Sequence, residues 1–494
     1  MNALKRLRSR LIEDFGFDKF RPGQRRACRA AIEGRDTVIL MPTGSGKSLC
    51  YQLPGLELEG VTVIVSPLIS LAEDQAAHIA ELGTAAAILN SSKSAKQIAK
   101  FREQIRSGKV EFVFTTPERL QRSDICELLA EVGVDMFVID EAHCASQWGH
   151  DFRPDYLCLH HARQRLGNPP ILAMTATAAP KTVAEILRTL RLSDPEIVST
   201  GVYRKNLRLE VQGCDDQADK DQRLRRLLVR DDSLESNQPA IVYCATTKTA
   251  RRLAQQLDDL PIPTLCYHGR MKKADRAAAQ QAFMEGPPAV MFATNAFGLG
   301  IDKPDIRRVI HYQIPGSLEA YYQEAGRAGR DGEPAICTLL YDPEDVAVQK
   351  MFAGGSLDAS QLRTAHHTLC QGLERWGESE GNVSLSDLTK ISPAGRQTLK
   401  RCLQQLASRG VAAPAGRGRW TCLNTELEDS VAEAIASDAR LRSEDRQIAL
   451  ERMVRYATAG DCRWATIETY FETDDSESEP CPCDNCGQRT PSVA

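Results

Sequence analysis

The sequence MFVIDEAHCASQWGHDFRPDY, residues 136–156, decides the fold class together with one partner motif. An apolar run at residues 136–139 predicts a buried strand, and Asp140 and Glu141 follow at its end. Two adjacent carboxylates in this position suit a divalent metal ion and an attacking water in phosphoryl transfer. The aromatic and basic residues that come next are suited to stacking on bases and contacting phosphates: Trp148, His150, Phe152, Arg153 and Tyr156. The simpler alternative is a strand end followed by a loop whose aromatic residues belong to the core.

The partner motif is a glycine-rich turn upstream, VILMPTGSGKS at residues 38–48. Small residues there let backbone N–H groups converge on a β-phosphate, and the start of a helix favours the anion. We predict that Lys47 reaches the β- and γ-phosphate oxygens and that Ser48 and Asp140 bind Mg²⁺. The pair of motifs therefore predicts a nucleoside triphosphatase. The expected phosphate-binding residues are Thr43, Gly44, Ser45, Gly46, Lys47 and Ser48.

Length and composition set broad limits. The 494 residues allow about three domains, and 42% hydrophobic with 26% charged residues is ordinary for a soluble globular protein. We expect no transmembrane helix and no signal peptide, because no long apolar run is present. The net charge of −4 argues against a purely electrostatic nucleic-acid binder, but local basic patches remain compatible with a nucleic-acid enzyme. Scattered cysteines in apolar runs favour a reducing, cytoplasmic compartment, with nucleoid association if the source is bacterial.

Two rounds of alternating apolar runs and helical patterns predict two lobes, each a parallel sheet covered by helices. Such lobes enclose a cleft that can open and close with nucleotide. The strands expected in the first round are 37–40, 61–66, 85–89, 110–115, 136–139 and 171–174. The second round begins near Leu207, and its expected strands are 240–244, 264–267, 289–293, 308–312 and 335–341.

The second round also contains YYQEAGRAGRDG at residues 321–332, which places Arg327 and Arg330 three residues apart. On a helix this spacing puts both side chains on one face. A guanidinium aimed at the γ-phosphate from the opposite lobe stabilises charge in the transition state. The alternative is a solvated helix face with no part in hydrolysis.

The ordered series of motifs resembles the RecQ family of superfamily 2 DNA helicases over roughly residues 10–345. The aromatic segment after DEAH and the FRPGQ element are hallmarks of this family rather than of helicases in general. The motifs are FGF from residue 15, FRPGQ from 20, MPTGSGKSLCYQLP from 41, VSPLISLAEDQ from 65, TTPERL from 115, DEAHCASQWGHDFRPDY from 140, MTATA from 174, IVYCATTK from 241, ATNAFGLGIDKPDIR from 293 and YYQEAGRAGRDG from 321.

The resemblance implies two RecA-like lobes and an ATP-dependent helicase acting on single-stranded and forked duplex DNA in repair and recombination. Its polarity of unwinding, 3′→5′, is implied by the family alone. Phe17 and Arg21 would sandwich adenine, and Gln24 would hydrogen-bond its edge. Glu141 would orient or deprotonate the attacking water, and Arg327 and Arg330 would contact the γ-phosphate. The residues implied to couple DNA to hydrolysis are Trp148, Phe152 and Arg153.

The segment from Val383 has a winged-helix pattern, with helices expected over 384–391 and 393–408 and glycine-rich strands after them. Seven basic residues and no acidic residue lie between Lys390 and Trp420, which suits contact with a duplex backbone. A basic helical hairpin that packs on a lobe is the alternative. The basic residues expected to contact DNA are Arg396, Lys400 and Arg401.

Four cysteines near the C-terminus, Cys462, Cys481, Cys483 and Cys486, predict a Cys₄ zinc site. They resemble the zinc-binding subdomain of the same family, with two departures. The spacing between the last three cysteines is one residue shorter than usual, and an acidic run at 472–479 intervenes. A one-residue gap is tight for tetrahedral geometry, so the pattern leaves open whether both Cys481 and Cys483 are ligands.

Four domains are therefore expected, and the order of the last two is unusual for the family because the winged-helix segment precedes the cysteines. Wing-driven fork splitting is in doubt for this reason, and we expect no accessory helical domain after Cys486. An ATP-gated DNA-binding or strand-annealing switch with weak unwinding is the alternative function, and an RNA helicase is a third. The expected domains are lobe one (1–203), lobe two (204–345), a winged-helix-like module (346–425) and a helical zinc-binding module (426–490).

Overall fold

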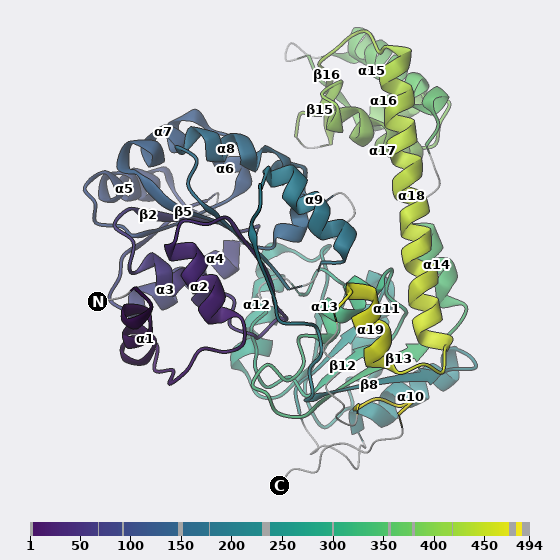
Figure 1. The fold of residues 1–494 in the computed structure, drawn as a ribbon. Coiled ribbons are helices and arrows are strands. Elements are labelled where there is room, and N and C mark those ends of the chain that lie inside the picture. The colour runs from purple at the N-terminus through teal and green to yellow at the C-terminus, as the bar shows by residue number, and fades with distance from the viewer. Residues whose placement is uncertain are drawn as a thin grey trace. The chain divides into compact units, whose positions relative to one another are not determined.

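The structure, a computed structural model, carries one parallel sheet in each of two lobes (Figure 1). Residues 1–349 with 452–494 form one compact unit, and residues 350–451 form a second. No helix among the described residues is long and apolar enough to cross a membrane. The structure describes residues 3–67, 69–90, 93–146, 152–176, 178–229, 238–298, 301–353, 357–377, 381–416, 418–473 and 481–486.

The first lobe contains a seven-stranded sheet in the order β3-β4-β2-β5-β6-β1-β7. Its strands are short, β-branched or aromatic runs, and alternate residues feed two apolar clusters, one on each face of the sheet. The strands are β1 (Thr37–Leu40), β2 (Val61–Val65), β3 (Ala86–Leu89), β4 (Phe112–Thr115), β5 (Val134–Ile139), β6 (Ile171–Thr175) and β7 (Glu196–Ser199). The helices are α1 (Ala3–Glu13), α2 (Gln24–Ile32), α3 (Leu49–Gly55), α4 (Ile69–Glu81), α5 (Ala95–Arg106), α6 (Pro117–Leu120), α7 (Ser123–Val132), α8 (Leu159–Arg165) and α9 (Pro180–Leu190), with 3₁₀ turns η1 (Ala142–Ala145) and η2 (Pro154–Cys158).

The strand order explains where the functional motifs meet. Strand β6 lies between β1 and β5, and all three pairings are parallel. The carboxyl ends of parallel strands share one edge of the sheet, which is where such folds bind ligands. The glycine-rich turn after β1 and the carboxylates after β5 therefore emerge at the same edge.

The sequence predicted each strand of the first sheet except β7. This strand sits at the end of the sheet and pairs with β1. Of its residues only Val198 is buried, because an edge strand faces solvent on one side. It therefore lacks the continuous apolar run that marked the other strands.

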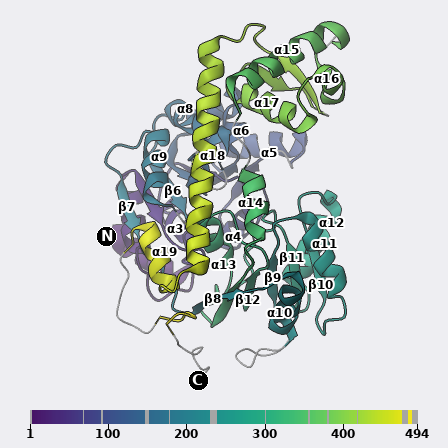
Figure 2. The same ribbon diagram turned by 90° about the vertical axis from the view of Figure 1, so that its right-hand side faces the viewer.

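The second lobe has a six-stranded parallel sheet in the order β10-β11-β9-β12-β13-β8. Figure 2 shows most of its strands, from β8 to β10. All of the strands predicted for this lobe are present. They are β8 (Leu207–Gly213), β9 (Ala240–Tyr243), β10 (Thr264–Tyr267), β11 (Val290–Ala293), β12 (Arg308–His311) and β13 (Ala335–Tyr341). The helices are α10 (Gln217–Val229), α11 (Thr247–Gln256), α12 (Lys273–Glu285), α13 (Leu318–Ala325) and α14 (Asp345–Ala353).

The unit of residues 350–451 has the helix, strand, helix, helix, strand, strand order of a winged helix, as predicted. Its three strands form an antiparallel sheet in the order β14-β16-β15. The elements are α15 (Ala359–Trp376), β14 (Val383–Ser384), α16 (Leu385–Ile391), α17 (Arg396–Ser408), β15 (Ala412–Pro414) and β16 (Arg419–Cys422). The apolar faces of α15, α16 and α17 enclose its core together with Trp420.

A 30-residue helix, α18 (Asp429–Thr458), follows the winged helix, and α19 (Arg463–Phe471) follows α18. The boundary between the two compact units falls within α18, after residue 451, whereas the predicted domain boundary was at residue 426. The reason is that Val431, Ile435 and Ala439, on the first part of α18, pack into the winged-helix core. The end of α18 and all of α19 pack instead into the core of the second lobe.

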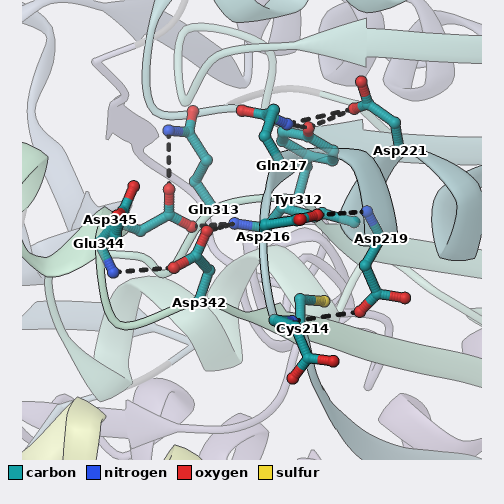
Figure 3. A network of polar contacts seen from close by, with 12 residues as sticks. Cys214, Asp216, Gln217, Asp219, Asp221, Tyr312, Gln313, Asp342, Glu344 and Asp345 are labelled. Carbon is teal, nitrogen blue, oxygen red and sulfur yellow. Dashed lines mark hydrogen bonds and ion pairs between the residues drawn. The ribbon is translucent and has the colours of Figure 1, made fainter.

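A buried polar network joins α10 to the end of β12 and the start of α14 (Figure 3). Tyr312 Oη donates to Asp221 Oδ1 at 2.5 Å, and Gln313 Nε2 donates to Asp345 Oδ1 at 3.2 Å. The ammonium of Lys220, 1% exposed, binds Asp345 and lies 3.7 Å from Asp342 Oδ2. Burial raises the pKa of the Asp345 carboxyl, and Lys220 opposes this shift.

We predict that Lys220→Met destabilises the second lobe by about 3–5 kcal/mol, because it leaves two buried carboxylates without their cation. Urea unfolding followed by circular dichroism measures the effect. Lys273→Met, at an exposed position of α12, is the matched control and should change stability by less than about 0.5 kcal/mol. Equal midpoints for the two variants would show that the network does not hold the lobe together.

Candidate functional site

The glycine-rich turn between β1 and α3 has a backbone that only glycine adopts without strain. Gly44 and Gly46 have φ values of 81° and 82°, in the left-handed region. A Cβ at Gly46 would also lie 2.6 Å from Gln24 Nε2. The turn is therefore specified both by backbone conformation and by a close side-chain neighbour.

Lys47 lies inside this turn. Its Nζ donates to the carbonyl oxygens of Met41 at 3.0 Å and Pro42 at 3.2 Å. Burial lowers the pKa of Lys47, while Glu141 and Asp140 oppose that shift. The structure thus brings the predicted lysine and both predicted carboxylates into one electrostatic group.

Asp140 and Glu141 directly follow β5. Asp140 Oδ1 accepts from the backbone N–H of Glu141 at 3.0 Å, and Ser66 Oγ lies 3.4 Å from Asp140 Oδ2. Burial, with the neighbouring Glu141 as a further cause, raises the pKa of Asp140 to about 7. A divalent cation would favour the charged form instead. Glu141 has φ 48°, a left-handed conformation that is strained for a residue with a side chain and is typical of functional sites.

The histidine of DEAH links two strand ends, a role that the sequence did not indicate. His143 Nδ1 lies 3.0 Å from Thr175 Oγ1, at the end of β6, and 3.3 Å from Glu141 Oε2. His143 is 1% exposed, so these contacts are shielded from solvent. The available signal was that MTATA and DEAH each follow a predicted strand, which becomes informative only once β5 and β6 are known to be neighbours.

The two arginines are not on a helix, so the predicted shared helix face is wrong. Helix α13 ends at Ala325, and both arginines lie in the turns after it. The chain breaks there because glycines flank both residues, and Gly329 has a left-handed φ of 54°. Their environments differ as a result.

Arg330 contacts the phosphate-binding turn of the first lobe. A Cβ at Gly44 would lie 3.3 Å from Arg330 Cγ, and the guanidinium lowers the pKa of Lys47 by charge repulsion. Arg330 Nη1 also pairs with Asp302 Oδ1 at 2.6 Å. Arg327, by contrast, donates to the carbonyl of Gly298 inside the second lobe and is 6% exposed.

Phe17 and Arg21, two of the three residues implied to bind adenine, line an open hollow of about 790 Å³ formed by residues 16–23 and 25. Phe17 is 49% exposed there. Arg21 Nη1 donates to the carbonyl of Gly44 at 2.7 Å, and Gln24 Nε2 donates to the carbonyls of Ser45 and Gly46 at 3.1 Å. The hollow is therefore directly connected to the phosphate-binding turn.

The segment after DEAH is only partly described, and Trp148 lies outside the described residues. Phe152 is half-buried. Arg153 is anchored by Nη1 to the carbonyl of Pro67 and by its backbone N–H to the carbonyl of Cys144, both at 3.0 Å. The suggestion that Tyr156 stacks on bases is wrong, because its ring is buried and its hydroxyl donates to the carbonyl of Asp140 at 3.0 Å.

The three basic residues expected to contact DNA lie on α17, the second and longer helix of the helix-turn-helix pair. Arg396, Lys400 and Arg401 are exposed. Leu399, Leu403 and other apolar residues of α17 face the core, while the three basic side chains remain exposed.

The four C-terminal cysteines converge. Their sulfur atoms all lie within 4.8 Å of one another, with Cys462 Sγ and Cys481 Sγ 3.2 Å apart. The one-residue gap is accommodated by a tight turn in which the Cys483 N–H donates to the Cys481 carbonyl at 2.9 Å. All four sulfurs therefore lie within reach of a single ion such as Zn²⁺.

This cysteine cluster is attached to the edge of the second sheet. Leu209 of β8 exchanges backbone hydrogen bonds with Pro482 at 3.1 Å and with Asp484 at 3.1 Å. Arg463 of α19 binds the Asp484 carboxylate in a bidentate pair, at 2.9 and 3.1 Å. Trp464, 2% exposed, donates its ring N–H to the carbonyl of Leu207 at 3.3 Å.

Three family descriptions match the chain in order. Residues 21–186 match the DEAD/DEAH box helicases, residues 219–332 the helicase conserved C-terminal domain, and residues 427–487 the RecQ zinc-binding domain. The probable ATP-dependent DNA helicase RecS of Bacillus subtilis is 43% identical over 349 residues, which are 70% of this chain and 69% of that protein. The chain belongs to the RecQ family of helicases. It is thereby an enzyme of the ATP-dependent DNA helicase class within superfamily 2.

Other comparisons agree with this RecQ assignment. The ATP-dependent DNA helicase RecQ of Bacillus subtilis is 42% identical over 351 residues, covering 70% of this chain and 58% of that protein. The chain thus spans little more than half of that relative. Among solved structures, the Mycobacterium smegmatis helicase Lhr bound to single-stranded DNA and AMP-PNP has a TM-score of 0.54 at 23% identity, over 85% of this chain and 60% of that one. This likeness concerns the fold alone.

We predict that Arg463→Ala lowers the stability of the second lobe by about 3 kcal/mol, because the half-buried Asp484 carboxylate loses its cationic partner. The same change should weaken zinc retention about 10- to 100-fold, since it loosens the segment that bears the last cysteines. Thermal unfolding and chelator competition measure the two effects. Arg455→Ala, at an exposed position of α18, is the control. Unchanged zinc retention in Arg463→Ala would contradict the positioning role of Arg463.

Proposed function

We propose that this RecQ-family chain hydrolyses ATP to move 3′→5′ on single-stranded DNA and to unwind forked or tailed duplexes in DNA repair and recombination. One observation carries the proposal: Lys47, Asp140 and Glu141 of the first lobe form one charged group with Arg330 of the second. Hydrolysis requires all of them, so closure of the lobes and chemistry are linked.

The ATP site follows from the geometry. Phe17 and Arg21 hold adenine at the hollow beside the phosphate-binding turn, and Gln24 recognises its edge. The β- and γ-phosphates take the place of the Met41 and Pro42 carbonyls as acceptors for Lys47. Thr43, Gly44, Ser45 and Gly46 complete the phosphate cradle with backbone N–H groups.

The hydrolytic groups lie at the ends of β1, β5 and β6. Ser48 and Asp140 would hold Mg²⁺, which would supply positive charge against the charge that develops on the phosphates. Glu141 orients or deprotonates the attacking water from a left-handed backbone conformation, with φ 48°. His143 connects Glu141 to Thr175, so the water-activating carboxylate is tied to the end of a neighbouring strand.

We assign different tasks to the two arginines. Arg330 contacts the γ-phosphate directly, because it already lies against the phosphate-binding turn. Arg327 donates a hydrogen bond to the Gly298 carbonyl of the second lobe. We propose that this bond fixes the turn that carries Arg330. Both serve the transition state, one by contact and one by position.

DNA is coupled to this site through the segment after DEAH. Tyr156 is bonded to the Asp140 carbonyl and Arg153 to the Pro67 carbonyl, so movement of the segment reaches the metal ligand directly. Trp148 and Phe152 stack on bases of the translocating strand. Arg396, Lys400 and Arg401 contact the duplex backbone from the exposed face of α17.

The C-terminal cysteine cluster is the zinc site of the proposal. Cys462, Cys481, Cys483 and Cys486 hold a structural Zn²⁺ that fixes the C-terminal segment to β8.

The alternative function is an ATP-gated DNA-binding or annealing switch, favoured by the position of the winged helix before the zinc cysteines. Strand separation measured beside ATPase activity divides the two functions.

The decisive experiment measures DNA-stimulated ATP hydrolysis and unwinding of 3′-tailed and 5′-tailed duplexes in parallel. We expect stimulation by single-stranded DNA and unwinding of the 3′-tailed substrate only. Stimulation without unwinding would favour the switch, and stimulation by RNA alone would exclude the DNA helicase. Trp148→Ala should retain ATP binding and lose DNA stimulation, so a normal response to DNA in that variant would refute the coupling role of Trp148.

We predict that Arg330→Ala reduces kcat for ATP hydrolysis by about 10³-fold or more, the range of an arginine finger. Its melting temperature should stay close to that of the wild type, because burial and the neighbouring Arg327 disfavour the Arg330 charge and so offset the lost pair with the largely exposed Asp302. Arg327→Ala should lower both kcat and the melting temperature, since it removes a buried hydrogen bond from the guanidinium to the Gly298 carbonyl. Steady-state kinetics and thermal unfolding of both variants test the assignment, which would fail if Arg330→Ala hydrolysed ATP normally.

A further inference from the structure

A second group of potential metal ligands lies in the winged-helix unit, outside every motif used above. His366 and Cys370 are on α15, one helical turn apart, and therefore on the same face. Cys422 is the last residue of β16 and approaches that face from the sheet. The side chain of His366 is 7% exposed and both cysteines are half-buried.

The three ligand atoms form a closed triangle. The two sulfurs are 3.8 Å apart, and His366 Nε2 lies 3.9 Å from Cys370 Sγ and 3.7 Å from Cys422 Sγ. Zinc-to-ligand lengths of about 2.3 Å for sulfur and 2.0–2.1 Å for nitrogen give tetrahedral edges of about 3.8 Å between sulfurs and about 3.6 Å between sulfur and nitrogen. All three observed distances are close to these edges, so an ion fits with little movement of the side chains.

His366 Nε2 and Cys422 Sγ share one hydrogen-bond acceptor. The Asn424 carbonyl lies 2.8 Å from His366 Nε2 and 2.9 Å from Cys422 Sγ. Metal binding displaces such protons, because thiolate and neutral imidazole are the ligating forms. Those two distances are shorter than a tetrahedral edge of about 3.4–3.6 Å, so the carbonyl is not placed as a fourth ligand. A water in the fourth position could instead donate to it.

We propose that His366, Cys370 and Cys422 bind a second Zn²⁺ ion in the winged-helix unit, with solvent as the fourth ligand. Two thiolates and an imidazole are the ligand set that favours Zn²⁺ over the harder divalent ions. The ion ties α15 to β16, the central strand of the three-stranded sheet. The hairpin of β15 and β16, which is the wing, is thereby fixed to the helical core.

The test is the zinc content of the full-length chain after dialysis against a weak chelator, measured by elemental mass spectrometry. We expect two ions per chain in the wild type and one in Cys370→Ser, Cys422→Ser and His366→Ala. His367→Ala is the matched control, since this neighbouring histidine of α15 is exposed and should leave two ions in place. Cys486→Ser should lose the other ion and retain this one, which separates failure of this site from failure of the Cys₄ site.

A measurement on the wild-type protein tests the proposal even if the variants do not fold. X-ray absorption at the zinc edge should give about three sulfur ligands per zinc, the mean of a Cys₄ and a Cys₂His site. One ion per chain with four sulfur ligands would overturn the proposal. A disulfide between Cys370 and Cys422 in freshly purified protein would overturn it as well, because it removes both thiolates.

Discussion

A buried set of opposite charges at the edge of the first sheet is the constraint on which the rest of the structure depends. Lys47 and Arg330 supply the cations, and Asp140 and Glu141 supply the anions. Burial raises the pKa of Asp140 and lowers that of Lys47, so the charged form of each group is disfavoured by burial and needs the opposite charges around it. Charges of this kind persist in a protein interior when they are held together and given hydrogen bonds. A bound triphosphate and cation extend this balance, since both bring charge to the same edge.

The remainder of the large unit supports that edge. The parallel order β1-β6-β5 fixes the distance between the phosphate-binding turn and the carboxylates. In the second lobe, Lys220 and its aspartates secure α10 and the start of α14, while α19 and the cysteine cluster cover β8 at the edge of the sheet. An exposed sheet edge is a liability, and pairing β8 with residues 482–484 protects it. The zinc-binding segment is thus part of the second lobe's core rather than an appendage.

Sequence motifs and tertiary structure contributed differently to the site. The strands of both lobes, apart from β7 and β8, were predicted because buried parallel strands are continuous apolar runs. The phosphate-binding turn and the carboxylates were predicted because their chemistry depends on consecutive residues. The helix predicted for Arg327 and Arg330 was wrong, since glycines end α13 before both of them. Tyr156 was assigned to base stacking because no local pattern distinguishes a buried tyrosine from an exposed one.

The sequence alone determined two parallel-sheet lobes, a winged helix and the residue types of an ATP site, because each rests on periodicity or on neighbours along the chain. Only the tertiary structure decided which arginine contacts the phosphate-binding turn and that His143 meets Thr175. It also decided that all four C-terminal sulfurs converge despite a tight spacing, and that Cys422 joins His366 and Cys370. These contacts join residues on different strands and helices. Their distances are set by how the elements pack, and packing leaves no signal in the spacing of residues along the chain.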